Sequence, residues 1–139
     1  MSAIVSTFIY CLGTTNMEGK NSPINAMGVL QNLTPEFIPS TFSFSIIVGI
    51  KQIDLSSDHK LDIIFKDTEG NNLVEAKDIP VSAEQLKSGD LNLPEDQRGL
   101  MLGLDLRNVI LKKEGNYKTE VRLDGIILGE FDIYAKAKN

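Results

Sequence analysis

The alternation of residues over positions 41–50 constrains the fold of this chain more than any other feature. In the segment TFSFSIIVGI an apolar residue stands at every second position, with small or polar residues at most positions between. The apolar set is Phe42, Phe44, Ile46, Val48 and Ile50. A period of two is the period of a β-strand, whose side chains point alternately to the two faces of a sheet. The sequence therefore predicts a strand with these five side chains facing a core.

Strand patterns of this kind continue along most of the chain. LDIIFKD is followed by TEGNN, in which Gly70 suits the left-handed conformation of a short hairpin loop. Strands are expected at residues 3–11, 24–33, 41–50, 61–67, 72–79, 100–111, 116–123 and 126–136. The prolines are Pro23, Pro35, Pro39, Pro80 and Pro94. They fall between the expected strands, which fits because proline cannot donate a backbone hydrogen bond within a sheet.

One short helix is expected after residue 81. Ser82 and Gln85 form the S-x-x-Q pattern of a capping box, and Gly89 stands where a C-terminal cap is expected. About eight strands with short polar turns predict an all-β fold, an antiparallel two-sheet β-sandwich of Ig-like or jelly-roll-like type. The helix is its connector. A length of 139 residues fits a single domain over residues 1–139.

The segment VRLDGIILGEFDIY, residues 121–134, predicts a hairpin. Asp124-Gly125 suits a two-residue turn with positive φ at both positions, which places Leu123 and Ile126 on one face. A one-residue bulge at Gly129 would then return the later apolar residues to the core face. A three-residue loop that buries Ile127 is the alternative, and we favour the bulge.

The charge pattern argues against a nucleic-acid partner. The net charge is −5, and the densest basic groups, 112–113 and 136–138, are short. A nucleic-acid binder is expected to carry a basic stripe, because phosphate contacts dominate its affinity. We interpret these lysines as solvated strand ends.

The sequence also indicates a compartment. No apolar run reaches the ~18 residues that a membrane span needs, so no membrane partner is expected. The segment MSAIVSTFIYCLG has no basic residue before its apolar run, which argues against a signal peptide. A single cysteine, Cys11, suits a reducing compartment, and we expect a cytoplasmic protein.

Catalytic groups are scarce. The one histidine, His59, stands in the polar segment SSDHK, where we expect a solvated turn residue rather than a base with an orienting partner. Cys11 could join it in a thiol dyad, but its apolar neighbours favour a buried inert thiol. We therefore expect no catalytic residue and a protein that is not an enzyme.

Acidic residues in two turns raise the question of calcium. They are Asp54, Asp58, Asp62, Asp67 and Glu69. DTEGNN lacks the later acidic ligand of a helix–loop–helix calcium site, and one cysteine with one histidine cannot supply a zinc ligand set. We interpret these acids as turn residues and expect no metal or other cofactor.

The order of these segments resembles a known family. YCLG, EGKNSPINAMGVL, TPEFIPSTFSFSIIVGI, HKLDIIFKDTEGNNL and EGNYKTEVRLDGIILGEFDIYAKA are similar to an uncharacterised family of small bacterial all-β proteins, a domain of unknown function. The closing G-N-Y…V-R-L-D-G…L-G-E is the most specific piece. The resemblance implies a sandwich fold and no particular chemistry. The segment 81–99 fits the family pattern poorly.

One loop suits a binding role. In LTPEFIPS, Phe37 and Ile38 stand between Pro35 and Pro39, whose rings stiffen the backbone. Exposed, they would form a rigid apolar anchor for a protein partner, with Glu36 beside them. The alternative is that Phe37 and Ile38 fold down and close one end of the sandwich.

These observations predict a non-enzymatic interaction module with a protein partner. A small-ligand or carbohydrate-binding sandwich is the alternative, and it would need a concave pocket with a few convergent polar groups. A hydrolase using loop carboxylates is a third hypothesis. The strand edges also leave a homodimer open.

Overall fold

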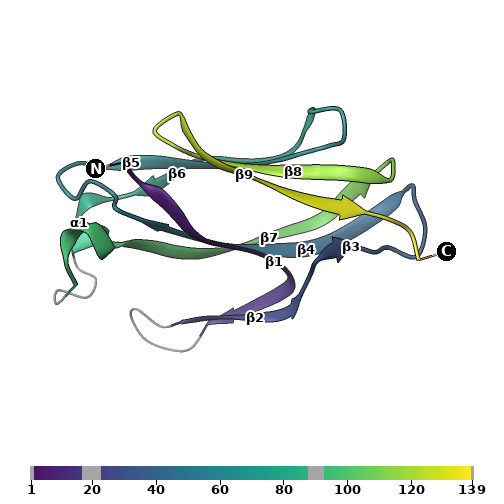
Figure 1. Ribbon diagram of the computed structural model, residues 1–139, viewed down its shortest axis with the longest axis horizontal. Coiled ribbons are helices and arrows are strands. Elements are labelled where there is room, and N and C mark those ends of the chain that lie inside the picture. The colour runs from purple at the N-terminus through teal and green to yellow at the C-terminus, as the bar shows by residue number, and fades with distance from the viewer. Residues whose placement is uncertain (1, 17–22, 88–92, 139) are drawn as a thin grey trace.

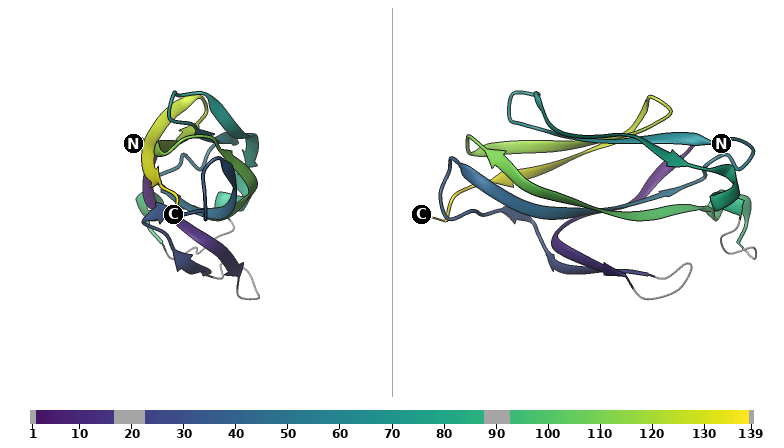
Figure 2. Two further views of the ribbon diagram at one scale, coloured as in Figure 1. Left: turned by 90° about the vertical axis from the view of Figure 1, so that its right-hand side faces the viewer. Right: turned by 180° about the vertical axis from the view of Figure 1, so that it is seen from behind.

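Two sheets packed face to face form the protein (Figures 1 and 2). The computed structural model describes residues 2–16, 23–87 and 93–138. Its strands are β1 (Ile4–Asn16), β2 (Ile24–Val29), β3 (Asn32–Leu33), β4 (Ser40–Lys51), β5 (His59–Lys66), β6 (Asn72–Val81), β7 (Gly99–Leu111), β8 (Gly115–Leu123) and β9 (Ile126–Ala135). Helix α1 (Ala83–Lys87) and a 3-10 turn (Glu95–Gln97) lie between β6 and β7.

The sheets have four and five strands, in the orders β2-β1-β4-β7 and β3-β9-β8-β5-β6. All pairings are antiparallel except that of β3 with β9. The predicted all-β sandwich is confirmed. The strand expected over 24–33 is divided, because β2 ends at Val29 and β3, which begins at Asn32, joins the other sheet. β1 runs beyond the expected end at residue 11, to Asn16, and pairs with β2.

The predicted inward face of β4 is confirmed. Phe44, Ile46, Val48 and Ile50 are buried, and Phe42 is half-buried at the end of the strand. The ring of Phe44 meets Phe65 edge-on from the opposite sheet, at a centroid distance of 5.2 Å. β4 lies between β1 and β7, so it is the central element of the core.

A buried tyrosine joins the two sheets. The Tyr10 hydroxyl of β1 donates to the Phe131 carbonyl at 2.6 Å and lies 2.7 Å from Oγ1 of Thr119, so β9 and β8 both hold it. Burial raises the pKa of Tyr10 well above its usual range. Beside it the rings of Phe8 and Phe131 stack with centroids 4.1 Å apart.

The β8–β9 hairpin has the predicted turn but a shifted bulge. Asp124 and Gly125 have φ values of 53° and 80°, as a two-residue turn requires. Val121 pairs with Gly129, so the extra residue is 128, one position earlier than expected. Ile127 is 51% exposed, so the three-residue loop is wrong.

The expected burial of Ile126 is also wrong. Its side chain is 67% exposed, because the tip of the hairpin lifts away from the opposite sheet (Figure 1). Farther along β9 the predicted core face returns, with Phe131 half-buried and Ile133 and Ala135 buried.

The short helix begins as predicted. The Gln85 amide donates to Oγ of Ser82 at 3.1 Å, and the Ser82 amide faces Oε1 of Gln85 at 3.5 Å, which completes the capping box. Gly89, the expected C-terminal cap, lies outside the described residues.

Truncating Phe44 tests the core. We expect Phe44→Ala to lower the free energy of unfolding by about 3–5 kcal/mol, through lost burial and the cavity left behind. Urea unfolding followed by circular dichroism measures it. Ile110→Ala, at a 52% exposed position of β7, is the control and should change stability by less than about 0.5 kcal/mol. Equal losses for both variants would contradict this assignment of the core.

Candidate functional site

The loop between β3 and β4 is held by the chain that follows β9 (Figure 1). The Lys136 amide donates to the Leu33 carbonyl and the Lys138 amide to the Pro35 carbonyl, both at 2.9 Å. The Lys138 ammonium pairs with the Glu36 carboxylate at 3.3 Å. These contacts fix the first half of the loop against a segment about a hundred positions later in the sequence.

The structure separates the two apolar residues that the sequence grouped. Phe37 is 65% exposed at the surface. Ile38 is half-buried and packs against the core, as the alternative predicted for both residues. Pro35, within the first half of the loop, is buried. The loop therefore presents a single exposed aromatic ring whose neighbours on both sides are anchored.

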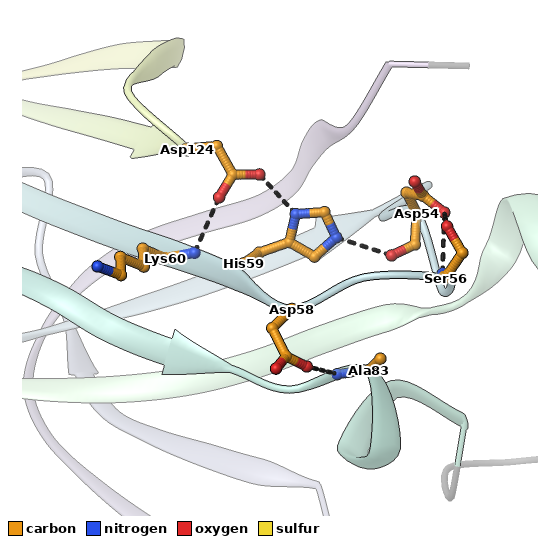
Figure 3. Close-up of polar contacts among 7 residues, drawn as sticks. All are labelled: Asp54, Ser56, Asp58, His59, Lys60, Ala83 and Asp124. Atoms are coloured by element: carbon orange, nitrogen blue, oxygen red, sulfur yellow. Dashed lines mark hydrogen bonds and ion pairs between the residues drawn. The ribbon is translucent and has the colours of Figure 1, made fainter.

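His59 is not the solvated turn residue that the sequence predicts. It is the first residue of β5 and only 8% exposed. Its Nδ1 lies 2.5 Å from Oδ2 of Asp124, in the β8–β9 turn, and its Nε2 lies 2.7 Å from the Asp54 carbonyl oxygen (Figure 3). β5 begins earlier than LDIIFKD indicates, which brings His59 into the sheet beside the hairpin tip.

Asp124 makes three hydrogen bonds, two through its carboxylate and one through its backbone amide. Its Oδ1 accepts the Lys60 amide at 3.0 Å (Figure 3). The Asp124 amide also donates to the Lys60 carbonyl at 2.8 Å. Its Oδ2 faces His59. The hairpin tip is thereby fastened to the start of β5. The sequence held one signal for this, since aspartate in a turn commonly accepts backbone amides.

Both ring nitrogens of His59 face acceptors. A carbonyl oxygen only accepts, so Nε2 carries a proton, and an ionised carboxylate likewise calls for a proton on Nδ1. Burial lowers the pKa of His59, but the bonds to Asp124 and to the Asp54 carbonyl outweigh burial and raise it. Burial raises the pKa of Asp124, and the bond to His59 outweighs it, so that pKa is lowered. The geometry is that of an imidazolium–carboxylate clamp, with the ring buried and the Asp124 side chain 46% exposed, rather than of a free base.

Cys11 is the buried thiol that the sequence favoured, and it lies away from His59. Cys11 is buried in β1 of the four-stranded sheet, and its Sγ donates to the Gly13 carbonyl at 3.3 Å. Burial raises the pKa of Cys11, which keeps the thiol protonated and unreactive. His59 belongs to the five-stranded sheet and its nitrogens are engaged by other groups.

Each of the three acids that bracket the loop before β5 accepts a backbone amide, and Asp62 lies within β5 rather than in a turn. Asp54 accepts from Ser56 at 2.9 Å, Asp58 from Ala83 at 2.8 Å and Asp62 from the amide of residue 78 at 2.8 Å. Within residues 2–16, 23–87 and 93–138, no three histidine, cysteine, aspartate or glutamate side chains are grouped so as to hold a metal ion.

Asp67 and Glu69 belong to the β5–β6 turn. Oδ1 of Asp67 accepts the amides of Glu69 at 2.9 Å and Asn71 at 2.8 Å. Burial raises the pKa of Asp67, but these bonds outweigh it and lower that pKa. Glu69 pairs with the ammonium of Lys113 at 2.6 Å.

Comparison with known proteins identifies the family. A family of unknown function (DUF6941) matches residues 11–136, so the chain belongs to that family. The expected resemblance to an uncharacterised all-β family is thereby confirmed. No curated protein matches the chain. No helix in the described part of the chain has the length and apolar character to cross a membrane.

Two solved structures show a distant likeness. A β-glucosidase from Listeria innocua in complex with glucose is 9% identical, with a TM-score of 0.49 over 96% of this chain and 16% of that one. A mutant of that enzyme in complex with laminaribiose is 9% identical, with a TM-score of 0.47 over 97% and 16%. The chain thus spans about 16% of their length.

The His59–Asp124 clamp makes stability depend on pH. With its pKa raised on folding, His59 contributes fully below its unfolded pKa of roughly 6.5, and the contribution is lost as the pH rises through the folded pKa. With its pKa lowered, Asp124 contributes above its unfolded pKa of about 3.9 and loses the contribution as the pH falls. The clamp is therefore strongest between these two values.

We expect the stability advantage of the native protein over His59→Gln to shrink as the pH rises from about 6 to about 9. Urea unfolding over a pH series measures it. Asp124→Asn should lose the same pH dependence, because asparagine keeps the turn but not the charge. Parallel pH profiles for all three proteins would show that His59 is not protonated in the fold.

Proposed function

We propose that this member of the family of unknown function is a non-enzymatic interaction module that binds a protein partner through Phe37. The observation that carries the proposal is the 65% exposure of this ring on a loop whose flanking residues are anchored. An aromatic side chain that is solvated when free loses much accessible surface when it enters a partner's pocket. Aromatic anchors of this kind dominate the affinity of many interfaces.

Rigidity of the loop supports the same role. Ile38 packs into the core on one side of Phe37, and Glu36 is held by Lys138 on the other. Because the backbone of the β3–β4 loop is already ordered in the free protein, binding of a partner to Phe37 does not incur the entropy cost of ordering this loop. The Glu36–Lys138 pair is exposed, so it would form part of a polar rim that affects the association rate more than the affinity.

The engagement of both His59 nitrogens supports the non-enzymatic part of the proposal, since the ring has no lone pair left to accept a proton. Cys11 is a free buried thiol, which supports the cytoplasm as the proposed location.

Replacing Phe37 with serine tests the proposal. We expect Phe37→Ser to leave the melting temperature nearly unchanged, because the ring is exposed, and to abolish co-purification of a stoichiometric partner from the native host. Affinity purification with quantitative mass spectrometry measures the partner, and calorimetry measures the melting temperature. Ile126→Ser is the matched control, since Ile126 is 67% exposed on the β8–β9 turn, and it should retain the partner.

Ile38→Ser separates packing from binding. Because Ile38 packs against the core, this variant should lower the melting temperature, whereas Phe37→Ser should not. A partner that stays bound to a folded Phe37→Ser variant would refute binding through this loop.

A further inference from the structure

A hollow on the outer face of the five-stranded sheet is independent of the Phe37 loop. It has a volume of about 330 Å³, and residues of the β5–β6 turn form part of its lining. Figure 1 shows this turn rising above the sheet. β5, β8 and β9 contribute the rest of its lining. The side chains that line it include Lys66, Asp67, Thr68, Asn116, Lys118 and Asp132.

The cationic groups at this hollow are already neutralised. The Lys66 ammonium lies 3.4 Å from the Glu120 carboxylate, and the Lys118 ammonium lies 3.2 Å from that of Glu130. Asp67 is occupied by the amides of its own turn. Two lysines and two aspartates line the hollow, and Glu120 and Glu130 pair with those lysines, so carboxylates outnumber ammonium groups there by four to two. The excess negative charge disfavours an anionic ligand.

Three lining groups are uncommitted. The Thr68 hydroxyl, the Asn116 carboxamide and the Asp132 carboxylate have no hydrogen-bond partner among the residues that the structure describes. Together they offer donors and acceptors. They come from the β5–β6 turn, β8 and β9, so the fold gathers them from three separate segments around one hollow.

An aromatic ring borders these groups. Tyr134 pairs directly with Asn116 in the β8–β9 ladder and stands two positions after Asp132, so it shares their face of the sheet. Its side chain is 46% exposed. On its other side the ladder places Asn32 of β3 opposite it. A partly exposed tyrosine offers a flat apolar surface together with a hydroxyl.

We propose that this face binds a neutral polyhydroxylated ligand, a saccharide. Sugar hydroxyls both donate and accept, which matches the carboxamide, hydroxyl and carboxylate of Asn116, Thr68 and Asp132. The apolar face of a sugar ring suits the ring of Tyr134. The excess of carboxylates disfavours an anionic ligand, and two of the three groups without a hydrogen-bond partner, those of Thr68 and Asn116, are neutral.

The site is open, so we expect dissociation constants in the millimolar range. Few ligand atoms would be buried, and a shallow polar hollow offers little apolar contact beyond Tyr134. This inference goes beyond the proposed function, because it uses a different surface and needs no protein partner.

Amide NMR spectra of the full chain test the inference. Glucose, galactose, maltose and cellobiose are added separately, up to tens of millimolar. At least one sugar should give saturable shifts centred on the amides of residues 68, 116, 118, 132 and 134. Tyr134→Ala should lower the affinity for that sugar about tenfold or more, because the main apolar contact is lost. Phe37→Ala, which removes another exposed ring, should leave the affinity unchanged.

Each other outcome overturns the inference. Flat titrations with all four sugars exclude a saccharide site, as do saturable shifts centred on another surface. Inorganic phosphate is added in a parallel titration, and a stronger response to phosphate than to any sugar would assign an anion site instead. The amide spectrum of Tyr134→Ala reports whether that variant is folded. Asn116→Ala is the second variant, and it should lower the affinity for the same sugar.

Discussion

The hydroxyl of Tyr10 is the interaction on which the arrangement of the two sheets depends. It lies in the core, where Tyr10 is buried, and has partners on β8 and β9, at Thr119 and Phe131. Leaving a buried hydroxyl without a partner costs about 1–3 kcal/mol, which penalises any other alignment of β1. A slip of one residue would turn Tyr10 outward and bring Cys11 toward the core. β1 is thus held in the register from which it continues to its pairing with β2.

The core does not determine the chemistry of the outer surfaces, and two of them differ in polarity. The anchored loop presents an apolar ring at Phe37, and the hollow beside Tyr134 presents polar groups. The two depend on different neighbours, the first on the segment after β9 and the second on the β5–β6 turn. The sandwich therefore carries one apolar and one polar surface on the same core. Separately, the His59–Asp124 clamp holds the tip of the β8–β9 hairpin in place.

Local patterns predicted the fold, and contacts between distant segments account for what they missed. The inward face of β4, the Asp124-Gly125 turn and the capping box at Ser82 depend on residues within a few positions of one another. The environment of His59 depends on Asp124, 65 positions later in the sequence, so a pattern of neighbouring residues cannot predict it. The separate fates of Phe37 and Ile38 likewise depend on the segment after β9. The hollow joins three segments, and only the sheet register reveals it.

The hold of the last described residues on the β3–β4 loop has a practical consequence. The backbone amides of Lys136 and Lys138 donate to the carbonyls of Leu33 and Pro35. The conformation of this loop therefore depends on the segment after β9 as well as on the residues of the loop itself. An exopeptidase that trimmed the chain back past Lys138 would loosen the loop while sparing the sheets. A bulky fusion attached after residue 138 would stand close to the same loop.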